Sequence, residues 1–164
     1  VKDLPGSEEA KAETIDNNLQ HEIVKKMSSN SVYYGKLSEM LKKIIMQRKA
    51  EAMSYEEYLR QVVELAEAIL HPEESGGYPD EIKASAARRA LYDYFEENAE
   101  LTIDVDNAIH DSIQPDWKRN FQKQQRIRLA IYKKLLLHMY AKDRATEETN
   151  NVFDIAQRQE EYDA

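Results

Sequence analysis

Residues 31–70 read SVYYGKLSEMLKKIIMQRKAEAMSYEEYLRQVVELAEAIL, and this stretch decides the fold. Apolar side chains recur in it at steps of three and four, which places them on one face of a helix. The first run is Tyr34, Leu37, Leu41, Ile44 and Ile45, and the second is Tyr55, Leu59, Val62, Ala66 and Ile69. The pattern predicts two antiparallel helices that form a central hairpin, against which the rest of the chain packs.

The corner between these two helices is marked by residues 53–58, MSYEEY. Ser54 is placed to accept a hydrogen bond from the free N–H groups that begin the second helix, and Glu57 is placed to return one to Ser54. Met53 and Tyr58 stand where a hydrophobic staple would close the corner. Because cap, box and staple agree, we predict that Ser54 is a structural residue that fixes the hairpin.

Composition narrows the class of protein. The 164 residues suffice for one domain with a real core, and 41% hydrophobic with 33% charged residues is typical of a soluble helical protein. The chain has no cysteine, which excludes a disulfide scaffold, a thiol nucleophile and cysteine-ligated zinc. The sequence shows neither a signal peptide pattern nor an apolar run near the roughly 18 residues of a membrane helix. We therefore expect a cytoplasmic location, and the first residue, Val1, indicates processing or a fragment of a longer protein.

The remaining segments predict a single all-α domain of six to eight helices. Residues 1–6 are expected to be a linker, and residues 7–164 the helical domain. Helices are predicted at about 7–27, 84–97, 100–113, 121–140 and 146–161, and no segment alternates as a strand would. Residues 71–79, HPEESGGYP, are rich in proline and glycine, so they predict a surface loop or a break between two lobes.

Charge is distributed unevenly along the chain. The net charge of −8 conceals a basic block of +7 at residues 112–144, between acidic blocks of −12 at residues 50–111 and −5 at residues 145–164. On a helical layout of residues 121–140, one exposed arc is almost purely basic and holds Lys123, Arg126, Lys133 and Lys134. A solvated charged face is one interpretation of this arc, and a strip that contacts phosphates is the other.

Two further residues of the basic block are predicted to be structural. Arg128 falls within the apolar arc of the same helix, where an unpaired charge is costly, so we expect it to be partly buried and ion-paired. Trp117, the only tryptophan, follows a helix that ends at Gln114–Pro115. It is expected to fill a junction between helices, with base stacking as the alternative.

No catalytic constellation emerges from the sequence. Residues 79–83, PDEIK, contain the Pro-Asp and Glu-x-Lys elements of metal-dependent nucleases, but overlap them within one short segment. We expect a helix start there, with Pro79 at the first helical position. Asp106 and His110 are four apart and are expected to pair at the surface. The sequence thus predicts neither catalytic residues nor a metal site.

Several short motifs resemble the C-terminal region of the motor-endonuclease (R) subunit of type I restriction enzymes. They are YYGKLSEML at 33–41, QR at 47–48, YEEYL at 55–59, YP at 78–79, RALYD at 89–93, DW at 116–117 and the segment 123–131. In the family motif the tryptophan precedes Arg-Gly-Asn, whereas Lys118-Arg119 replaces Arg-Gly here. A glycine at that place would permit a left-handed turn that Arg119 must avoid.

The resemblance implies one part of a bacterial complex in which the R subunit docks on methyltransferase and specificity subunits, translocates double-stranded DNA with ATP, and cuts it. ATP and magnesium are then held by other domains of an ATP-dependent nuclease, and this domain needs no cofactor. We expect a non-catalytic assembly and DNA-contacting domain whose DNA-binding residues are Lys118, Arg119, Lys123, Arg126, Lys133 and Lys134. Two alternatives are a purely structural protein–protein module without DNA contact, and an enzyme domain that uses the Asp80 region.

Overall fold

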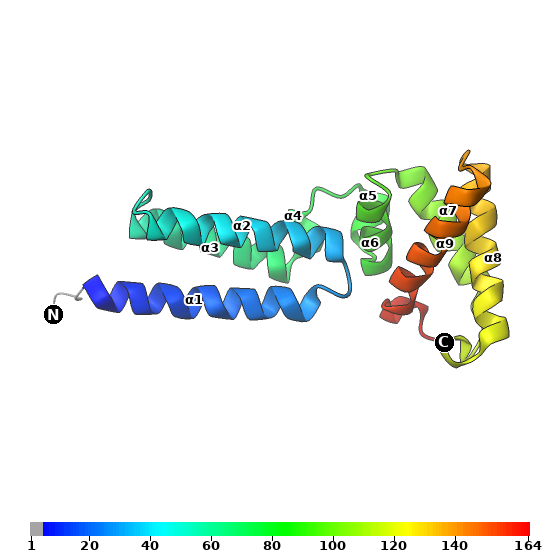
Figure 1. The fold of residues 1–164 in the computed structure, drawn as a ribbon, viewed down its shortest axis with the longest axis horizontal. Helices are drawn as coiled ribbons and strands as arrows, with labels where there is room; N and C mark the ends of the chain where they lie inside the picture. Colours follow the sequence, from blue (N-terminus) through cyan, green and yellow to red (C-terminus); the bar gives the residue numbers. More distant parts are fainter. Residues whose placement is uncertain (1–4) are drawn as a thin grey trace. The chain divides into compact units, whose positions relative to one another are not determined.

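The computed structural model describes residues 5–164, and over this range the chain is all-α, as predicted (Figure 1). The chain forms two compact units, and the boundary between them lies between Gly77 and Tyr78. This boundary falls inside residues 71–79, for which the sequence predicted a loop or a break between lobes. We refer to them as the first unit and the second unit. Of the linker expected at residues 1–6, residues 1–4 lie outside the described range, and Pro5 and Gly6 already belong to a helix. None of the described helices is both long and apolar enough to cross a membrane.

The first unit contains the predicted hairpin and one long helix before it. Its helices are α1 (Pro5–Lys26), α2 (Ser31–Lys49), α3 (Tyr55–Leu70) and the single turn α4 (Pro72–Ser75). The helices α1, α2 and α3 lie side by side (Figure 1). Four predicted residues of α2 and two of α3 are buried, namely Tyr34, Leu37, Leu41, Ile44, Val62 and Ile69, and the other predicted ones are half-buried. Three residues outside the predicted runs, Tyr33, Tyr58 and Leu65, are also buried. From α1 the apolar side chains of Ala12 and Ile23 are fully covered.

The corner of the hairpin is capped as the sequence predicted, but only by half of the capping box. The Ser54 hydroxyl accepts a hydrogen bond of 3.1 Å from the Glu57 N–H. The Glu57 carboxylate accepts hydrogen bonds from Arg60 and Gln61, and the structure shows none to it from the Ser54 N–H. The Arg60 and Gln61 hydrogen bonds lower the pKa of Glu57 to about 2. The predicted return bond is therefore wrong, because a guanidinium three residues on is the stronger partner.

A buried carboxylate, which the apolar pattern did not predict, holds the three long helices of the first unit together. Asp16 of α1 is only 5% exposed. Its carboxylate accepts a 2.5 Å hydrogen bond from the Tyr58 hydroxyl and a 2.7 Å bond from the Arg48 guanidinium. Arg48 also donates to Glu9 at 2.6 Å. Burial and the Asp16 hydrogen bond raise the pKa of Tyr58. Each long helix thus supplies one member of this cluster.

The second unit has seven helical elements and its own hydrophobic core. They are α5 (Asp80–Lys83), α6 (Ala86–Tyr94), α7 (Ala99–Ser112), the 3-10 turn η1 (Trp117–Arg119), α8 (Phe121–Leu137), α9 (Lys142–Gln157) and the 3-10 turn η2 (Glu160–Tyr162). The predicted face of α7 is buried, including Leu101, Val105 and Ile109. These residues pack against Ile127 and Ile131 of α8 and Phe153 of α9.

A second buried carboxylate lies in this unit, at Asp106 of α7. It is 2% exposed and accepts hydrogen bonds from the Arg88 Nε at 2.8 Å and the Tyr162 hydroxyl at 2.6 Å. His110 Nε2 lies 3.3 Å from the same carboxylate. The predicted pair of Asp106 and His110 is present. The prediction that it lies at the surface was wrong, because Asp106 is buried where three elements of the unit meet. Burial and Asp106 together raise the pKa of Tyr162.

The segment that contains η2 joins several elements of the second unit. The Glu161 carboxylate accepts hydrogen bonds from the Ser85 hydroxyl at 2.6 Å and the Ala87 N–H at 3.0 Å, both at the start of α6. The carbonyl of Tyr162 accepts a 2.7 Å bond from the Trp117 indole. The tyrosine side chain is fully buried. This segment is therefore an integral part of the second unit's core.

Candidate functional site

The segment with nuclease-like residues forms a short structural turn. Asp80 begins the single-turn helix α5, its side chain is 95% exposed, and Lys83 pairs with it at 2.9 Å. Pro79 is the residue before the helix, one position earlier than predicted. Ile82 between them is fully buried in the second unit. Within residues 5–164, no group of three histidine or acidic side chains is arranged to hold a metal ion.

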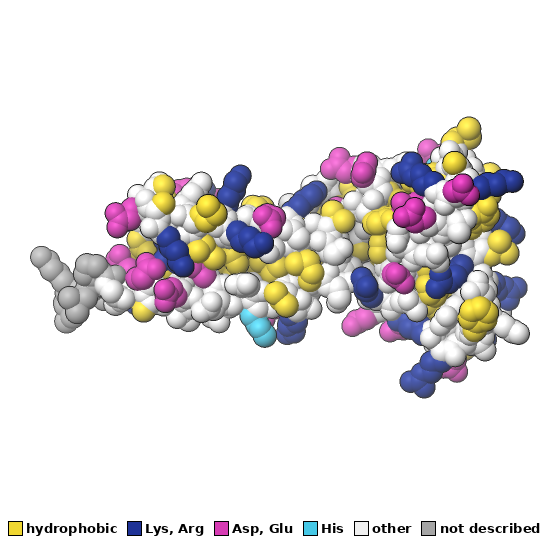
Figure 2. All heavy atoms as spheres, viewed as in Figure 1, with side chains coloured by type: hydrophobic (Ala, Val, Ile, Leu, Met, Phe, Trp, Pro, Cys, Tyr) yellow, Lys and Arg dark blue, Asp and Glu magenta, His cyan; other side chains and the backbone are white. Residues whose placement is uncertain are grey.

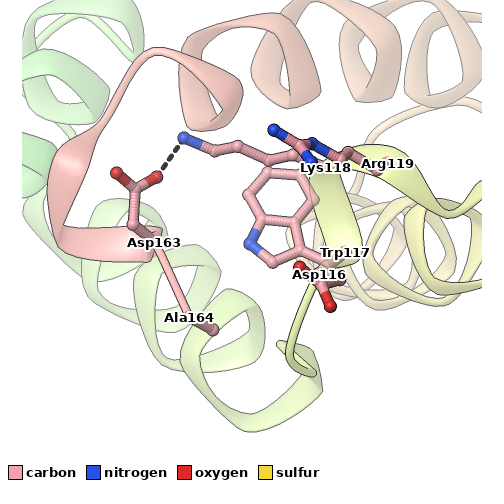
Figure 3. A pocket seen from close by; sticks show the side chains of 6 residues that line it. All are labelled: Asp116, Trp117, Lys118, Arg119, Asp163 and Ala164. Carbon is pink, nitrogen blue, oxygen red and sulfur yellow. Dashed lines mark hydrogen bonds and ion pairs between the residues drawn. The ribbon is translucent and has the colours of Figure 1, made fainter.

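Trp117 fills a junction between helices, as predicted. Its indole is 1% exposed, lies edge-on to the Phe153 ring at 5.8 Å, and donates to the Tyr162 carbonyl. Trp117 is one of six residues that line a pocket of about 350 Å³, together with Asp116, Lys118, Arg119, Asp163 and Ala164. Figure 3 shows the tryptophan between Lys118 and Asp163. A base-stacking platform needs an exposed ring face, so the stacking alternative does not fit this residue.

The turn before Trp117 shows which residue adopts the left-handed conformation that the glycine of the family motif would permit. The residue in the left-handed region is Asp116, with φ of 62°, and not Arg119. Aspartate tolerates this conformation better than most residues because its short side chain forms local hydrogen bonds. Arg119 lies in η1 with an ordinary backbone conformation. The replacement of glycine by Arg119 therefore causes no strain here.

The six predicted DNA-binding residues all lie on η1 and α8, but they are not equally accessible. Lys118 pairs with Asp163, as the dashed line in Figure 3 marks. Lys123 donates to the Pro115 carbonyl at 2.5 Å. The exposed members are Arg119, Arg126 and Lys133, whereas Lys123 and Lys134 are half-buried. The prediction that all four arc residues are exposed is thus wrong for two of them.

The exposed face of α8 is also not purely basic. Leu129 is 52% exposed and Leu137 is 72% exposed. Together with Arg126 and Lys133 they follow one another at steps of three and four, so the four residues lie on one helix face. We call Arg126, Leu129, Lys133 and Leu137 the mixed strip. Figure 2 shows basic and hydrophobic side chains beside each other along the α8 edge of the second unit.

Arg128 lies toward α9, and its partners differ from the predicted carboxylate. Its guanidinium donates to the amide oxygen of Asn150 and stacks over the Phe153 ring at 4.0 Å from the ring centre. The side chain is half-buried, as expected. The expected ion pair is wrong, because α9 presents an amide and an aromatic face at this position. The Nε atom of Arg128 is buried without a hydrogen-bond partner.

A groove of about 240 Å³ runs beside this arginine between α8 and α9. Its lining residues are Gln125, Arg128, Leu129, Tyr132, Thr146, Thr149 and Asn150. Thr149 is 6% exposed, and its hydroxyl also lacks a hydrogen-bond partner. Among the described residues four buried side-chain atoms lack partners, and two of them belong to this groove.

The chemistry that this site offers is binding by hydrogen bonds, charge and apolar contact. Arg128 Nε is a donor, the Thr149 hydroxyl can donate or accept, and Leu129 is an apolar contact at the groove's edge. Sequence reasoning did not identify Leu129 or Thr149, since neither belongs to a recognisable motif. Comparison of the chain with protein families, with curated proteins and with solved structures finds no match in any of the three.

Proposed function

We propose that this chain is a non-catalytic assembly and DNA-contacting domain of a type I restriction motor subunit. The proposal is supported by where the residues that carry the family resemblance lie. Leu37, Leu41, Leu91, Trp117 and Ile131 are all buried in the cores of the two units. These motif residues therefore maintain the fold of the two units. A domain whose motifs maintain its fold contributes surfaces to a complex rather than catalytic groups.

The observation that carries the DNA-contacting part is the gathering of cations on η1 and α8. Arg119, Arg126 and Lys133 are exposed, and none has an ion pair within the described part of the chain. Arg126 and Lys133 are seven residues apart on one helix, about 10 Å along its axis. Exposed cations at such spacing can each contact a backbone phosphate, and phosphate contacts release counterions from DNA.

Binding of the whole chain to duplex DNA as a function of salt tests this proposal. Alanine at Arg119, Arg126 or Lys133 should weaken binding regardless of DNA sequence and reduce the slope of log K against log salt by about one unit each. Lys43→Ala in the first unit is the matched control, because Lys43 is exposed in α2 but lies outside the basic block. Equal slopes for all four variants would contradict a DNA contact by these residues.

The assembly part has its own test. The whole chain should co-purify with a methyltransferase–specificity core of a type I enzyme in a pull-down, and failure of every such core to retain it would count against the assignment. In the parent enzyme, replacement of Asp80, Glu81 and Lys83 by alanine should leave DNA cleavage intact. Loss of cleavage with normal assembly and ATP hydrolysis would instead favour an enzymatic role for α5.

A second candidate function is a protein–protein module that does not touch DNA. One observation favours it specifically, namely that Leu129 and Leu137 are interleaved with the cations of α8. Leucine side chains gain little from a hydrated phosphate backbone but gain free energy when a protein surface covers them. Retention by the methyltransferase–specificity core without measurable DNA binding would identify this second function.

A further inference from the structure

We propose that the α8–α9 groove and the mixed strip together receive an acidic amphipathic helix of a partner protein. This inference rests on the assembly part of the proposed function and names the surface and the class of partner; it assigns Arg126 and Lys133 to that partner in place of DNA. Three features of the second unit support it: unpartnered polar atoms in the groove, exposed leucines on α8, and the sign of the charges that flank them.

The polar atoms indicate what the groove lacks. A buried donor or hydroxyl without a partner loses its hydrogen bonds to water and gains none in return, so such atoms are rare in folded proteins. Arg128 Nε and the Thr149 hydroxyl are both in this state and both line the groove. A carboxylate is the group that suits them, because a guanidinium N–H and a hydroxyl both donate to carboxylate oxygens. Since both atoms are covered in the free protein, a rotation of side chains in the groove must accompany entry of the carboxylate.

The apolar residues indicate the shape of the partner. Leu129 borders the groove, and Leu137 lies two turns further along the same face of α8. Two exposed leucines eight residues apart match a partner helix that lies along α8 and presents its own apolar residues at steps of three and four. A partner helix can cover this line, whereas a peptide that binds as a β-strand would need a sheet edge, and the described residues form no strand.

The charges indicate the sign of the partner. Arg126 and Lys133 flank Leu129 on the exposed face, and neither has an acidic partner in the described part of the chain. A partner helix with glutamates beside its apolar face would pair with both cations while its leucines cover Leu129 and Leu137. DNA would satisfy the cations but leave the leucines exposed to water, so the combined surface favours an acidic protein helix.

A titration with synthetic peptides tests this directly. The first probe is a 16-residue helical peptide with leucine on one face and glutamate on both flanks; the second has lysine in place of each glutamate. In spectra of the isotope-labelled whole chain, the glutamate peptide should shift the amide signals of Gln125, Leu129 and Asn150. Larger shifts of the same signals by a short DNA duplex, with none from the glutamate peptide, would overturn the proposal in favour of DNA.

Exchange of the charges separates recognition from structural damage. Arg126→Glu combined with Lys133→Glu should weaken the glutamate peptide at least tenfold and create binding of the lysine peptide. Leu129→Ser should also weaken binding of the glutamate peptide about tenfold, whereas Leu70→Ser in the first unit, at a leucine of similar exposure, should not. If the charge exchange fails to reverse the preference, electrostatic recognition by the mixed strip is wrong.

Thr149→Val examines the groove itself. Valine keeps the shape of the side chain and removes the unpartnered hydroxyl, so the free protein should be at least as stable as the parent. Binding of the glutamate peptide should nevertheless weaken several-fold. Lower stability with unchanged binding would show that the hydroxyl serves the fold, which overturns the assignment of the groove.

The same variants, measured with the methyltransferase–specificity core, distinguish this inference from the proposed function. If the methyltransferase–specificity core retains the parent chain but not the Leu129→Ser variant, both the assembly function and the groove proposal are supported. If the core retains the Leu129→Ser variant as well as the parent chain, and the glutamate peptide shifts no amide signals, the assembly function stands and the proposal for the groove is wrong. Peptide binding at the groove without retention by any core sustains the groove and refutes the family assignment.

Discussion

The two units hold their helices together with the same kind of buried cluster, one aspartate between an arginine and a tyrosine. In the first unit Asp16 accepts from Arg48 and Tyr58 at 2.7 and 2.5 Å. In the second unit Asp106 accepts from Arg88 and from Tyr162 at 2.8 and 2.6 Å. In both, one carboxylate satisfies two long side chains from other helices, so the cluster specifies which helix faces meet.

The clusters differ in how the chain supplies their members. In the first unit the three residues come from three consecutive long helices, and Arg48 has a second carboxylate partner in Glu9. In the second unit the tyrosine comes from η2, 56 residues after the aspartate in sequence. The Arg88 side chain is 26% exposed, whereas that of Arg48 is 7% exposed. The first cluster is thus formed by consecutive helices, whereas the second requires η2, which follows all the α-helices of its unit, to fold back onto α7.

Removal of the aspartate should be the most damaging change in either unit. Asp16→Ala and Asp106→Ala each remove the buried carboxylate that an arginine and a buried tyrosine share, and removal of one partner of a buried ion pair typically costs about 3–5 kcal/mol. Trp117 is the only tryptophan and lies in the second unit, so its fluorescence reports unfolding of that unit. Hydrogen exchange of residues 5–77 reports the first unit.

The readouts of these variants also test whether the two units are energetically independent. Asp106→Ala should shift the urea midpoint of Trp117 fluorescence, and Asp16→Ala should instead remove protection from residues 5–77. Asp80→Ala, at a side chain that is 95% exposed, is the control and should change neither. A Trp117 midpoint that moves equally in the Asp16 and Asp106 variants would show that the units unfold as one.

Much of the fold follows from local sequence signals. Ser54 was identified as a cap because its partner is three residues away, and the buried faces of α2, α3 and α7 follow the helical period. These predictions succeed because short-range geometry determines them. The two buried aspartates were missed because a periodicity analysis treats an acid as a surface residue, and their partners are 18–56 residues away.

The candidate site was harder to predict than the fold for a related reason. The helical layout of residues 121–140 predicts an apolar arc of Ile127, Ile131, Leu135, Met139, Tyr132 and Leu136. The first three are buried, but the prediction is wrong for Met139, which is 91% exposed because α8 already ends at Leu137. The layout also did not give the width of the exposed face, because α7 and α9 pack against α8 from two directions and leave Leu129 and Leu137 uncovered. The Arg128 partner was missed because nothing in the local sequence shows that Asn150 of α9 lies opposite it.

The tyrosines of the two clusters predict a loss of stability at alkaline pH. Burial raises the pKa of Tyr162 and of Tyr58 above that of an unfolded tyrosine, which is about 10. The folded state therefore keeps the proton longer, so the stabilisation is complete below pH 10 and is lost as the pH rises further. For Tyr162 the loss should reach at most about 1.4 kcal/mol per pH unit.

Urea titrations between pH 9 and 11, followed by Trp117 fluorescence, measure this effect in the second unit. Tyr162→Phe should be less stable than the parent at pH 8, because Asp106 loses a donor, but its stability should decline less between pH 10 and 11. In Tyr58→Phe, the urea midpoint of Trp117 fluorescence should fall between pH 10 and 11 as much as it does in the parent. Parallel declines in the parent and Tyr162→Phe would show that another group titrates.

Helix caps offer a smaller comparison between the units. Ser54 caps α3 of the first unit, and Asn120 caps α8 of the second by accepting from the Lys123 N–H at 3.1 Å. Replacement of either by alanine should cost about 1 kcal/mol. Ser54→Ala should increase hydrogen exchange in residues 54–60 only, and Asn120→Ala should lower the Trp117 midpoint. An unchanged midpoint in the second variant would show that α8 is held by packing alone.

The smallest expected effect concerns Glu57, which distinguishes an exposed ion pair from the buried clusters. Hydrogen bonds from Arg60 and Gln61 lower the pKa of Glu57 to about 2, from an ordinary value of 4.5. Because the folded pKa lies below the unfolded one, the stabilisation is present above pH 4.5 and is lost as the pH falls toward 2. The pair is solvent-exposed, so salt should screen most of it. Glu57→Gln should therefore reduce the acid-induced rise in hydrogen exchange of α3 slightly at low salt and not at all in 1 M salt. An equal effect of Glu57→Gln at both salt concentrations would show that Glu57 acts through its hydrogen bonds rather than its charge.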